Sequence, residues 1–121
     1  MIEPAPFRED QVLSVALKFA EDSGEPHPSL IQHAAGPHDH AFEIGSFGNR
    51  IPRDSTRCFL IAVRGSFVLH NAHPPAGVEA PRGTVLVLYI NAETGAYMGR
   101  GLGDLFPDLE KLGPVTTDLS R

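Results

Sequence analysis

Histidines are the residues whose type and spacing point most directly to chemistry in this chain. An imidazole side chain titrates near neutral pH and is the commonest metal ligand in proteins. The 121-residue sequence contains six: His27, His33, His38, His40, His70 and His73. The first four lie close together, and the last two lie at the start of a proline-rich segment. The chain therefore has two histidine-based candidate sites.

The pair His38 and His40 is the candidate metal site. On a strand, two residues at this spacing would point to one face, because strand side chains alternate. A third ring would complete a zinc or copper site, with Asp39 or Glu43 as a carboxylate partner. The sequence has no His-Glu-x-x-His motif and no cysteine pair, so surface histidines without a ligand are the alternative. A divalent metal is the one cofactor that these residues suggest.

The proline-rich segment 71–82 is the candidate recognition surface. It is long for a connection between two strands, and long connections often carry function. Its prolines restrict the backbone and lower the entropic cost of binding. The expected ligand- or partner-binding residues are His70, His73, Pro74, Pro75 and Arg82. A bound anion, a peptide or protein partner, and a rigid connection without any partner are the alternatives here.

Nucleophilic catalysis has little basis in the sequence. Cys58 opens an apolar run, where a thiol is expected to be buried and inert. Ser66 lacks the second glycine of a Gly-x-Ser-x-Gly turn and precedes no helix. The glycines at 99–103 do not form a dinucleotide-binding motif, because position 104 is not glycine and too few residues follow for a strand–helix–strand unit.

A small lyase or isomerase with a pocket between helix and sheet is a further alternative. Such a site needs a buried acid or base with a tyrosine partner, and Tyr89 and Tyr97 are available. No carboxylate lies at the centre of the expected strands 57–70 and 83–91. An enzyme is therefore the less favoured interpretation.

Composition limits the class of protein. Ten basic and 15 acidic residues give a net charge of −5, which argues against nucleic-acid binding because phosphate contacts need a basic surface. One cysteine excludes an internal disulfide and a cysteine-based zinc cluster. The hydrophobic fraction of 41% is too high for a disordered chain.

The longest apolar runs, 59–63 and 85–90, are far shorter than the roughly 20 residues of a membrane span. Charged residues near the start do not fit a signal peptide. We therefore expect a cytoplasmic protein, or a secreted or lipid-anchored one if a leader was removed ahead of Met1.

The elements that must position these residues follow from periodicity. Residues 8–22 have an apolar face at helical spacing, with Gly24 as a natural stop. The expected strands are 29–35, 57–70, 83–91 and 96–101. Gly65 predicts a bulge within its strand, and residues 91–95 predict a tight hairpin turn. Residues 39–47 fit a short helix or a strand, and 104–113 fit a helical turn.

Two of the expected strands, 57–70 and 83–91, are apolar on both faces. An antiparallel sheet with one wet face alternates apolar and polar residues, so both faces of this sheet should be covered. The main helix covers one. The other is covered either by the segment 25–50 and the C-terminal tail, or by a second copy in a homodimer, and we slightly favour the homodimer.

Turn chemistry also carries a resemblance. The hairpin Asn91–Gly95, the internal Gly65-Ser66-Phe67 and the later Gly101-Leu102-Gly103 are similar to features of PepSY-type and cystatin-like domains, over roughly residues 8–113. The resemblance implies a helix packed in a curved antiparallel sheet. It also implies a function in the regulation or inhibition of peptidases. The Gln-x-Val-x-Gly hairpin of cystatins is absent, which argues against inhibition of that kind.

Together these patterns predict one α+β domain over 1–121, with a core at 8–113 and tails at 1–7 and 114–121. Its fold is one main N-terminal helix on a curved antiparallel sheet of three to five strands. The expected function is a non-enzymatic binding or regulatory module that presents the segment 71–82 to a peptide or protein. A histidine metal protein and a small lyase or isomerase are the alternatives.

Overall fold

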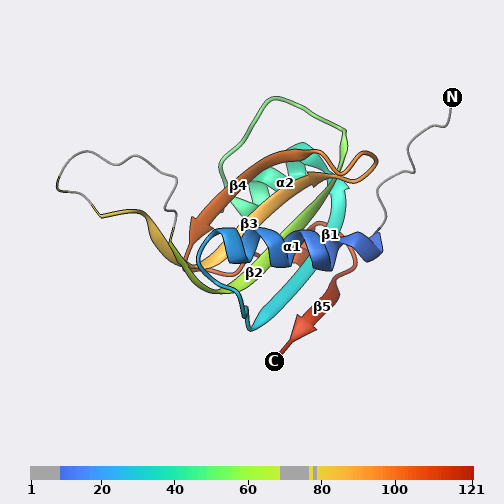
Figure 1. Ribbon diagram of the computed structural model, residues 1–121. Coiled ribbons are helices and arrows are strands. Elements are labelled where there is room, and N and C mark those ends of the chain that lie inside the picture. The colour runs from blue at the N-terminus through green and yellow to red at the C-terminus, as the bar shows by residue number, and fades with distance from the viewer. Residues whose placement is uncertain (1–8, 69–76, 78) are drawn as a thin grey trace, which may run out of the picture.

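The computed structural model describes residues 9–68, 77 and 79–121. It confirms the α+β class, because one main helix and one short helix pack on a five-stranded antiparallel sheet (Figure 1). The elements are η1 (Glu9–Gln11), α1 (Val12–Asp22), β1 (Leu30–Pro37), α2 (His38–Gly45), β2 (Arg57–Val68), β3 (Arg82–Asn91), β4 (Tyr97–Gly103), η2 (Leu109–Lys111) and β5 (Thr116–Ser120). The strand order in the sheet is β4-β3-β2-β1-β5.

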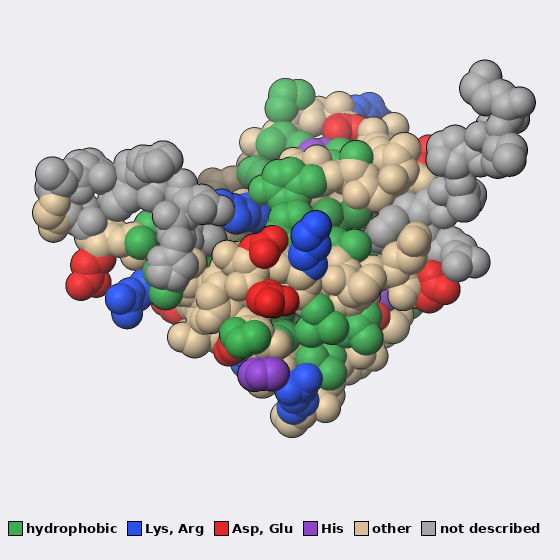
Figure 2. Space-filling model, viewed as in Figure 1, with side chains coloured by type: hydrophobic (Ala, Val, Ile, Leu, Met, Phe, Trp, Pro, Cys, Tyr) green, Lys and Arg blue, Asp and Glu red, His purple; other side chains and the backbone are tan. Residues whose placement is uncertain are grey.

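Helix α1 covers one face of the sheet, here called the α1 face. Val12, Ala16 and Ala20 are fully buried and lie at successive turns of the helix, so the two alanines let its backbone approach the strands closely. The strand side chains below it are Phe59, Ile61, Val63, Phe67, Leu86, Leu88 and Ile90. Figure 2 shows this side of the molecule, with hydrophobic side chains flanking the charged outer surface of the helix.

The opposite face, here called the α2 face, is covered by the chain itself. Its buried strand side chains are Ala34, Cys58, Leu60, Ala62, Val85, Val87 and Tyr89. Ala41 of α2 and Leu109 of η2 are buried against them. The alternative in which the chain folds back over its own sheet is therefore confirmed, and the homodimer stays a prediction.

Two local features predicted from glycines, the bulge at Gly65 and the hairpin turn at Gly95, are confirmed. The pairing of β2 with β3 shifts register between Arg64 and Phe67, which places a bulge at Gly65. The Glu25 side chain occupies the space a side chain at Gly65 would need, and its carboxylate accepts a hydrogen bond from the Ser66 N–H at 3.0 Å. In the hairpin, Gly95 has a φ of 77°, a left-handed conformation that glycine adopts without strain.

Two sequence expectations need correction. Residues 116–120, expected in a tail, form strand β5 and pair with β1. Residues 36–37, expected to break the first strand, are its last two residues. For the segment 39–47, the short helix is confirmed and the strand is not, since α2 begins directly after the first strand at His38.

Candidate functional site

The predicted metal pair does not converge on one point. His38 and His40 lie in the first turn of a helix rather than on a strand, so two residues of separation turn their side chains to different sides. The His38 ring lies 2.9 Å from the Asp54 carboxylate and edge-on to Tyr89, whereas His40 is exposed. Among the described residues, no three histidine, cysteine or acidic side chains are grouped to hold a metal ion.

The predicted recognition segment falls largely outside the described residues, which include neither His70, His73, Pro74 nor Pro75. Arg82 is described, and it is the exposed first residue of β3. Arg82 lies near the end of β4, since it lines one hollow together with Asp104. Two residues after Arg82, Thr84 donates hydrogen bonds to the Asp104 carboxylate from its N–H and its hydroxyl, at 3.1 and 3.2 Å. Recognition by the segment 71–82 thus stays a prediction.

The predicted lyase or isomerase pocket has no support from the position of Tyr89. Tyr89 lies on the α2 face rather than under the main helix, with the rings of His38 and Phe42 against it. Burial raises the pKa of its hydroxyl to about 12. Burial likewise raises the pKa of the Cys58 thiol to about 12, and the prediction that Cys58 is buried is confirmed.

His33 is the histidine that sequence reasoning passed over. Its side chain is 2% exposed, and both ring nitrogens face carboxylates: Nδ1 lies 2.6 Å from Asp118 and Nε2 lies 2.8 Å from Glu9. Phe59 packs edge-on against the ring. Hydrogen bonds and charge from the two carboxylates outweigh burial and raise the pKa of His33. The cluster joins η1, β1 and β5, which are far apart in the sequence.

Strand β4 is where the exposed apolar surface of the described residues collects. Three large hydrophobic side chains stand out as exposed there: Phe47 (55%), Tyr97 (51%) and Leu105 (68%). Tyr97 begins β4 and stacks on Phe19 of α1, while Leu105 lies two residues beyond the end of the strand. Phe47 follows α2 and lines the same hollow as Leu105. Phe47 and Leu105 thus border one hollow on the α2 side of β4, while Tyr97 lies at the other end of the strand on the α1 face.

The hollow that Phe47 and Leu105 share is here called the β4 groove. It has a volume of about 330 Å³ and lies between the end of α2 and strand β4. Its floor includes Val85 and Val87 of β3, opposite Gly103 and Gly101 of β4. A Cβ atom at Gly103 would meet no atom within 4 Å. Glycine therefore leaves the groove open where other residues would fill it.

Phe47 is the strained residue of this region. Its φ is 57°, and among the described residues it is the only one other than glycine with a positive φ. That conformation is uncommon outside glycine, asparagine and aspartate, and it costs about 1 kcal/mol or more. The phenyl ring is exposed and lines both the β4 groove and a second hollow. A strained backbone that presents an apolar ring to solvent is typical of functional sites.

The second hollow is larger, at about 550 Å³, and lies between α2 and the segment around η2. Ile44, Phe47 and Phe106 give it apolar walls. The charged and polar side chains that line it are His40, Glu43, Asp108 and Lys111. Arg50 holds the Glu43 carboxylate at 3.3 Å. Phe47 thus borders two adjoining hollows on the α2 side of the molecule.

Comparison with protein-family models, with curated proteins and with solved structures finds no match to this chain. The resemblance to PepSY-type and cystatin-like domains therefore stays a prediction. None of the helices in the described part of the chain has both the length and the apolar character to span a bilayer.

Proposed function

We propose that the chain is a non-enzymatic binding module that takes an extended segment of a partner protein as an added strand on β4. The observation that supports this most is that two exposed apolar side chains, Phe47 and Leu105, border one hollow beside a single edge strand. Exposed apolar side chains collected in one place mark interaction surfaces. An edge strand offers unpaired backbone groups to another chain. The two features coincide at β4.

The backbone of β4 supplies the affinity in this proposal. In an antiparallel ladder, alternate residues direct their N–H and C=O groups to the neighbouring strand, and the others direct theirs outward. Among the described strands, only β3 pairs with β4. The outward groups of β4 can therefore bind an extended segment, while hollows beside the strand select its side chains.

The location at β4 is compatible with the predicted recognition segment 71–82. Its described end, Arg82, opens β3 and lines the same shallow hollow as Asp104, directly after β4. A partner seated on β4 would pass close to this point. The proposal therefore keeps the expected class of function and moves its centre from the segment 71–82 to the edge strand.

Filling the β4 groove tests the proposal. Gly103→Val adds a side chain where there is open space, so the fold is kept while the groove is lost. Ser120→Val is the matched control, because Ser120 is an exposed residue of β5, the strand at the other edge. The probe is an acetylated heptapeptide of alternating threonine and valine, titrated while the amide resonances of the protein are followed by NMR.

We expect the peptide to shift the amide resonances of β4 and not those of β5. Gly103→Val should weaken binding about tenfold, since about 1.5 kcal/mol or more is lost when one valine side chain is no longer buried. Ser120→Val should bind like the wild type. Equal shifts at both edges, no shift at β4, or unchanged affinity in Gly103→Val would contradict the proposal.

A further inference from the structure

The two sides of β4 differ in a way that defines the sequence of the partner segment. Residues paired directly across an antiparallel ladder point to the same face. Gly99, Gly101 and Gly103 pair with Tyr89, Val87 and Val85, which belong to the α2 face. Between the glycines, β4 carries Arg100 and Leu102, which pair with Leu88 and Leu86 of the α1 face.

On the α2 face, β4 presents the side chain of Met98 near its start and none at Gly101 and Gly103. A Cβ atom at Gly103 would meet nothing within 4 Å, and one at Gly101 would touch only Val87. An added strand beside β4 would point alternate side chains to this face. These would meet the apolar β4 groove rather than competing side chains. Large apolar residues of the partner therefore fit here.

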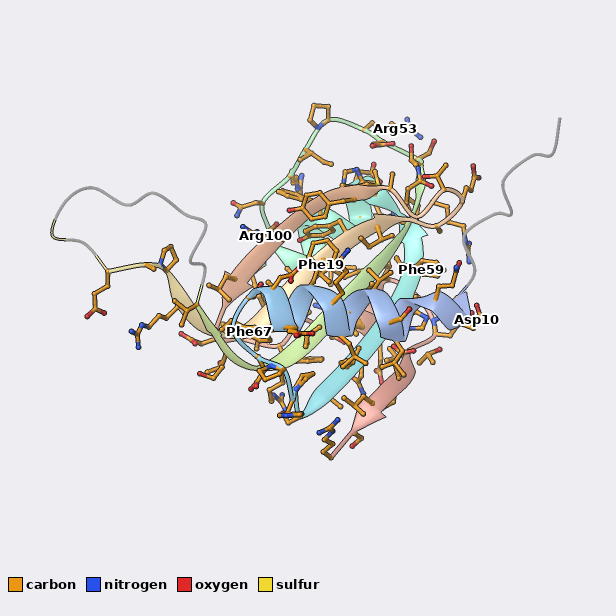
Figure 3. The ribbon with its side chains drawn as sticks, viewed as in Figure 1. Asp10, Phe19, Arg53, Phe59, Phe67 and Arg100 are labelled. Carbon is orange, nitrogen blue, oxygen red and sulfur yellow. The ribbon has the colours of Figure 1, made fainter. Side chains whose placement is uncertain are left out.

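On the α1 face, β4 presents a cation. Arg100 is exposed and lies on the same side of the sheet as Phe19 of α1 (Figure 3). Among the described residues, none of the ion pairs involves Arg100. If the two apolar residues lie beside Gly101 and Gly103, the partner residue between them points to this face directly across from Leu102, with Arg100 as its diagonal neighbour. Long side chains reach diagonal neighbours on an adjacent strand, and opposite charges stabilise such a pair, so an acidic residue fits here.

A second copy of the chain fits this edge poorly. If two β4 strands paired with each other about the central Gly101, glycine would lie opposite glycine on the α2 face, because the residues at 99 and 103 would also meet. The two β4 grooves would then stay empty. The steric room at this edge therefore favours a different chain with large side chains.

From this arrangement we infer that the partner segment has the pattern apolar–acidic–apolar, with the two apolar side chains in the β4 groove and the acidic one within diagonal reach of Arg100. The inference rests on the proposed pairing with β4. It adds the chemistry of the partner: a protein segment in extended conformation, with Leu, Ile or Phe on one side and Asp or Glu on the other.

Four heptapeptides with threonine flanks test the pattern: they differ only in a central Leu-Glu-Leu, Leu-Gln-Leu, Leu-Lys-Leu or Ala-Glu-Ala. The measurement is affinity and β4 amide shifts at low salt. We expect Leu-Glu-Leu to bind about two- to fivefold more tightly than Leu-Lys-Leu, with Leu-Gln-Leu between them. Ala-Glu-Ala should bind at least tenfold more weakly than Leu-Glu-Leu, because two apolar contacts are lost.

Charge reversal at Arg100 separates the local interaction from the overall field. Arg100→Glu should invert the order, so that Leu-Lys-Leu binds more tightly than Leu-Glu-Leu. Arg121→Glu changes the net charge equally at the far edge of the sheet, where Arg121 bonds to Ser29 beside β1, and should keep the wild-type order.

The outcomes test the acidic position, the apolar positions and the pairing at β4 separately. Equal affinity for the three leucine peptides, or the same effect of both charge reversals, would overturn the acidic position while leaving pairing at β4 intact. Equal affinity for leucine and alanine peptides would overturn the apolar positions. If no peptide shifts the β4 amides, the proposed function itself fails.

Discussion

A buried imidazole with a carboxylate at each ring nitrogen makes both hydrogen bonds only when both nitrogens carry a proton. This is the situation of His33, whose Nδ1 faces Asp118 and whose Nε2 faces Glu9. When the ring loses a proton, one nitrogen becomes an acceptor that faces an acceptor. Glu9 is 60% exposed and can turn to water, whereas Asp118 is largely buried and cannot do so as readily. When the His33 ring is protonated, its two hydrogen bonds therefore join η1, β1 and β5.

The sign of the resulting pH dependence follows from the raised pKa of His33. The stabilisation is complete below the ordinary value of 6.5 and is lost as the pH rises through the folded-state pKa. We predict that the free energy of unfolding of the wild type falls between pH 6 and pH 9. In His33→Gln it should be lower by about 3 kcal/mol at pH 6 and should fall less with pH. Urea unfolding at several pH values measures both.

Glu9 and Asp118 face the His33 ring, and Arg57 acts on Glu9 through its charge. The pKa of Glu9 is lowered, mainly by its hydrogen bond to His33, so its own contribution is lost at acid pH, outside the measured window. Glu9→Gln is the control, since it keeps His33 and removes one charge. An identical decline from pH 6 to pH 9 in the wild type and in His33→Gln would contradict the role assigned to His33.

At the scale of elements, the backbone conformation of Phe47 at the end of α2 costs folding free energy, and the phenyl ring is exposed there. Helices commonly end on a left-handed glycine, yet here a phenylalanine takes that conformation, with a φ of 57°. We predict that Phe47→Gly stabilises the chain by about 0.5–1 kcal/mol. It should also weaken peptide binding in the β4 groove, which loses one of its apolar walls. Urea unfolding and the peptide titration measure the two effects.

The neighbouring residue supplies the control for Phe47. Ser46 has a φ of −102°, an ordinary conformation in which glycine brings no relief from strain, so Ser46→Gly should destabilise the chain. A loss of stability in Phe47→Gly, or unchanged peptide affinity, would contradict the view that this backbone strain serves the groove.

The elements also show what periodicity and turn chemistry can predict. The main helix, the bulge at Gly65 and the hairpin at Gly95 follow from local patterns, and the structure confirms them. Strand β5 has a polar sequence without clear alternation, and it is a strand because β1 pairs with it. The His33 cluster joins residues 24 and 85 positions away in the sequence, so no local spacing indicates it. The β4 groove likewise depends on glycines whose faces only the register defines.

At the scale of the whole molecule, the sheet is enclosed by its own chain on both faces, and the proposed partner would bind at one of its two edges. The edge at β5 is short and is tied down by Asp118 at His33 and by the Gln32 amide at Thr117, 2.9 Å away. The edge at β4 is rich in glycine and bordered by exposed apolar side chains. The two edges of the sheet therefore differ in structure, and under the proposed function they differ in role: β5 completes the fold and β4 takes the partner.

This division predicts that β5 is essential to the fold although its sequence reads as a tail. Deleting residues 114–121 would remove Asp118 from the buried His33, expose the outer edge of β1 and strip the packing of Leu119 from the α1-face core. Leaving one partner of a buried ion pair alone costs about 3–5 kcal/mol, and a domain of this size has about 5–15 kcal/mol of stability in all. We expect circular dichroism to show that the truncated chain is largely unfolded, or that it melts at least about 15 °C below the wild type. Removal of Arg121 alone is the control and should leave the melting temperature nearly unchanged. A truncated chain that melts with the wild type would show that β5 is dispensable, and would remove the reason for assigning the two edges different roles.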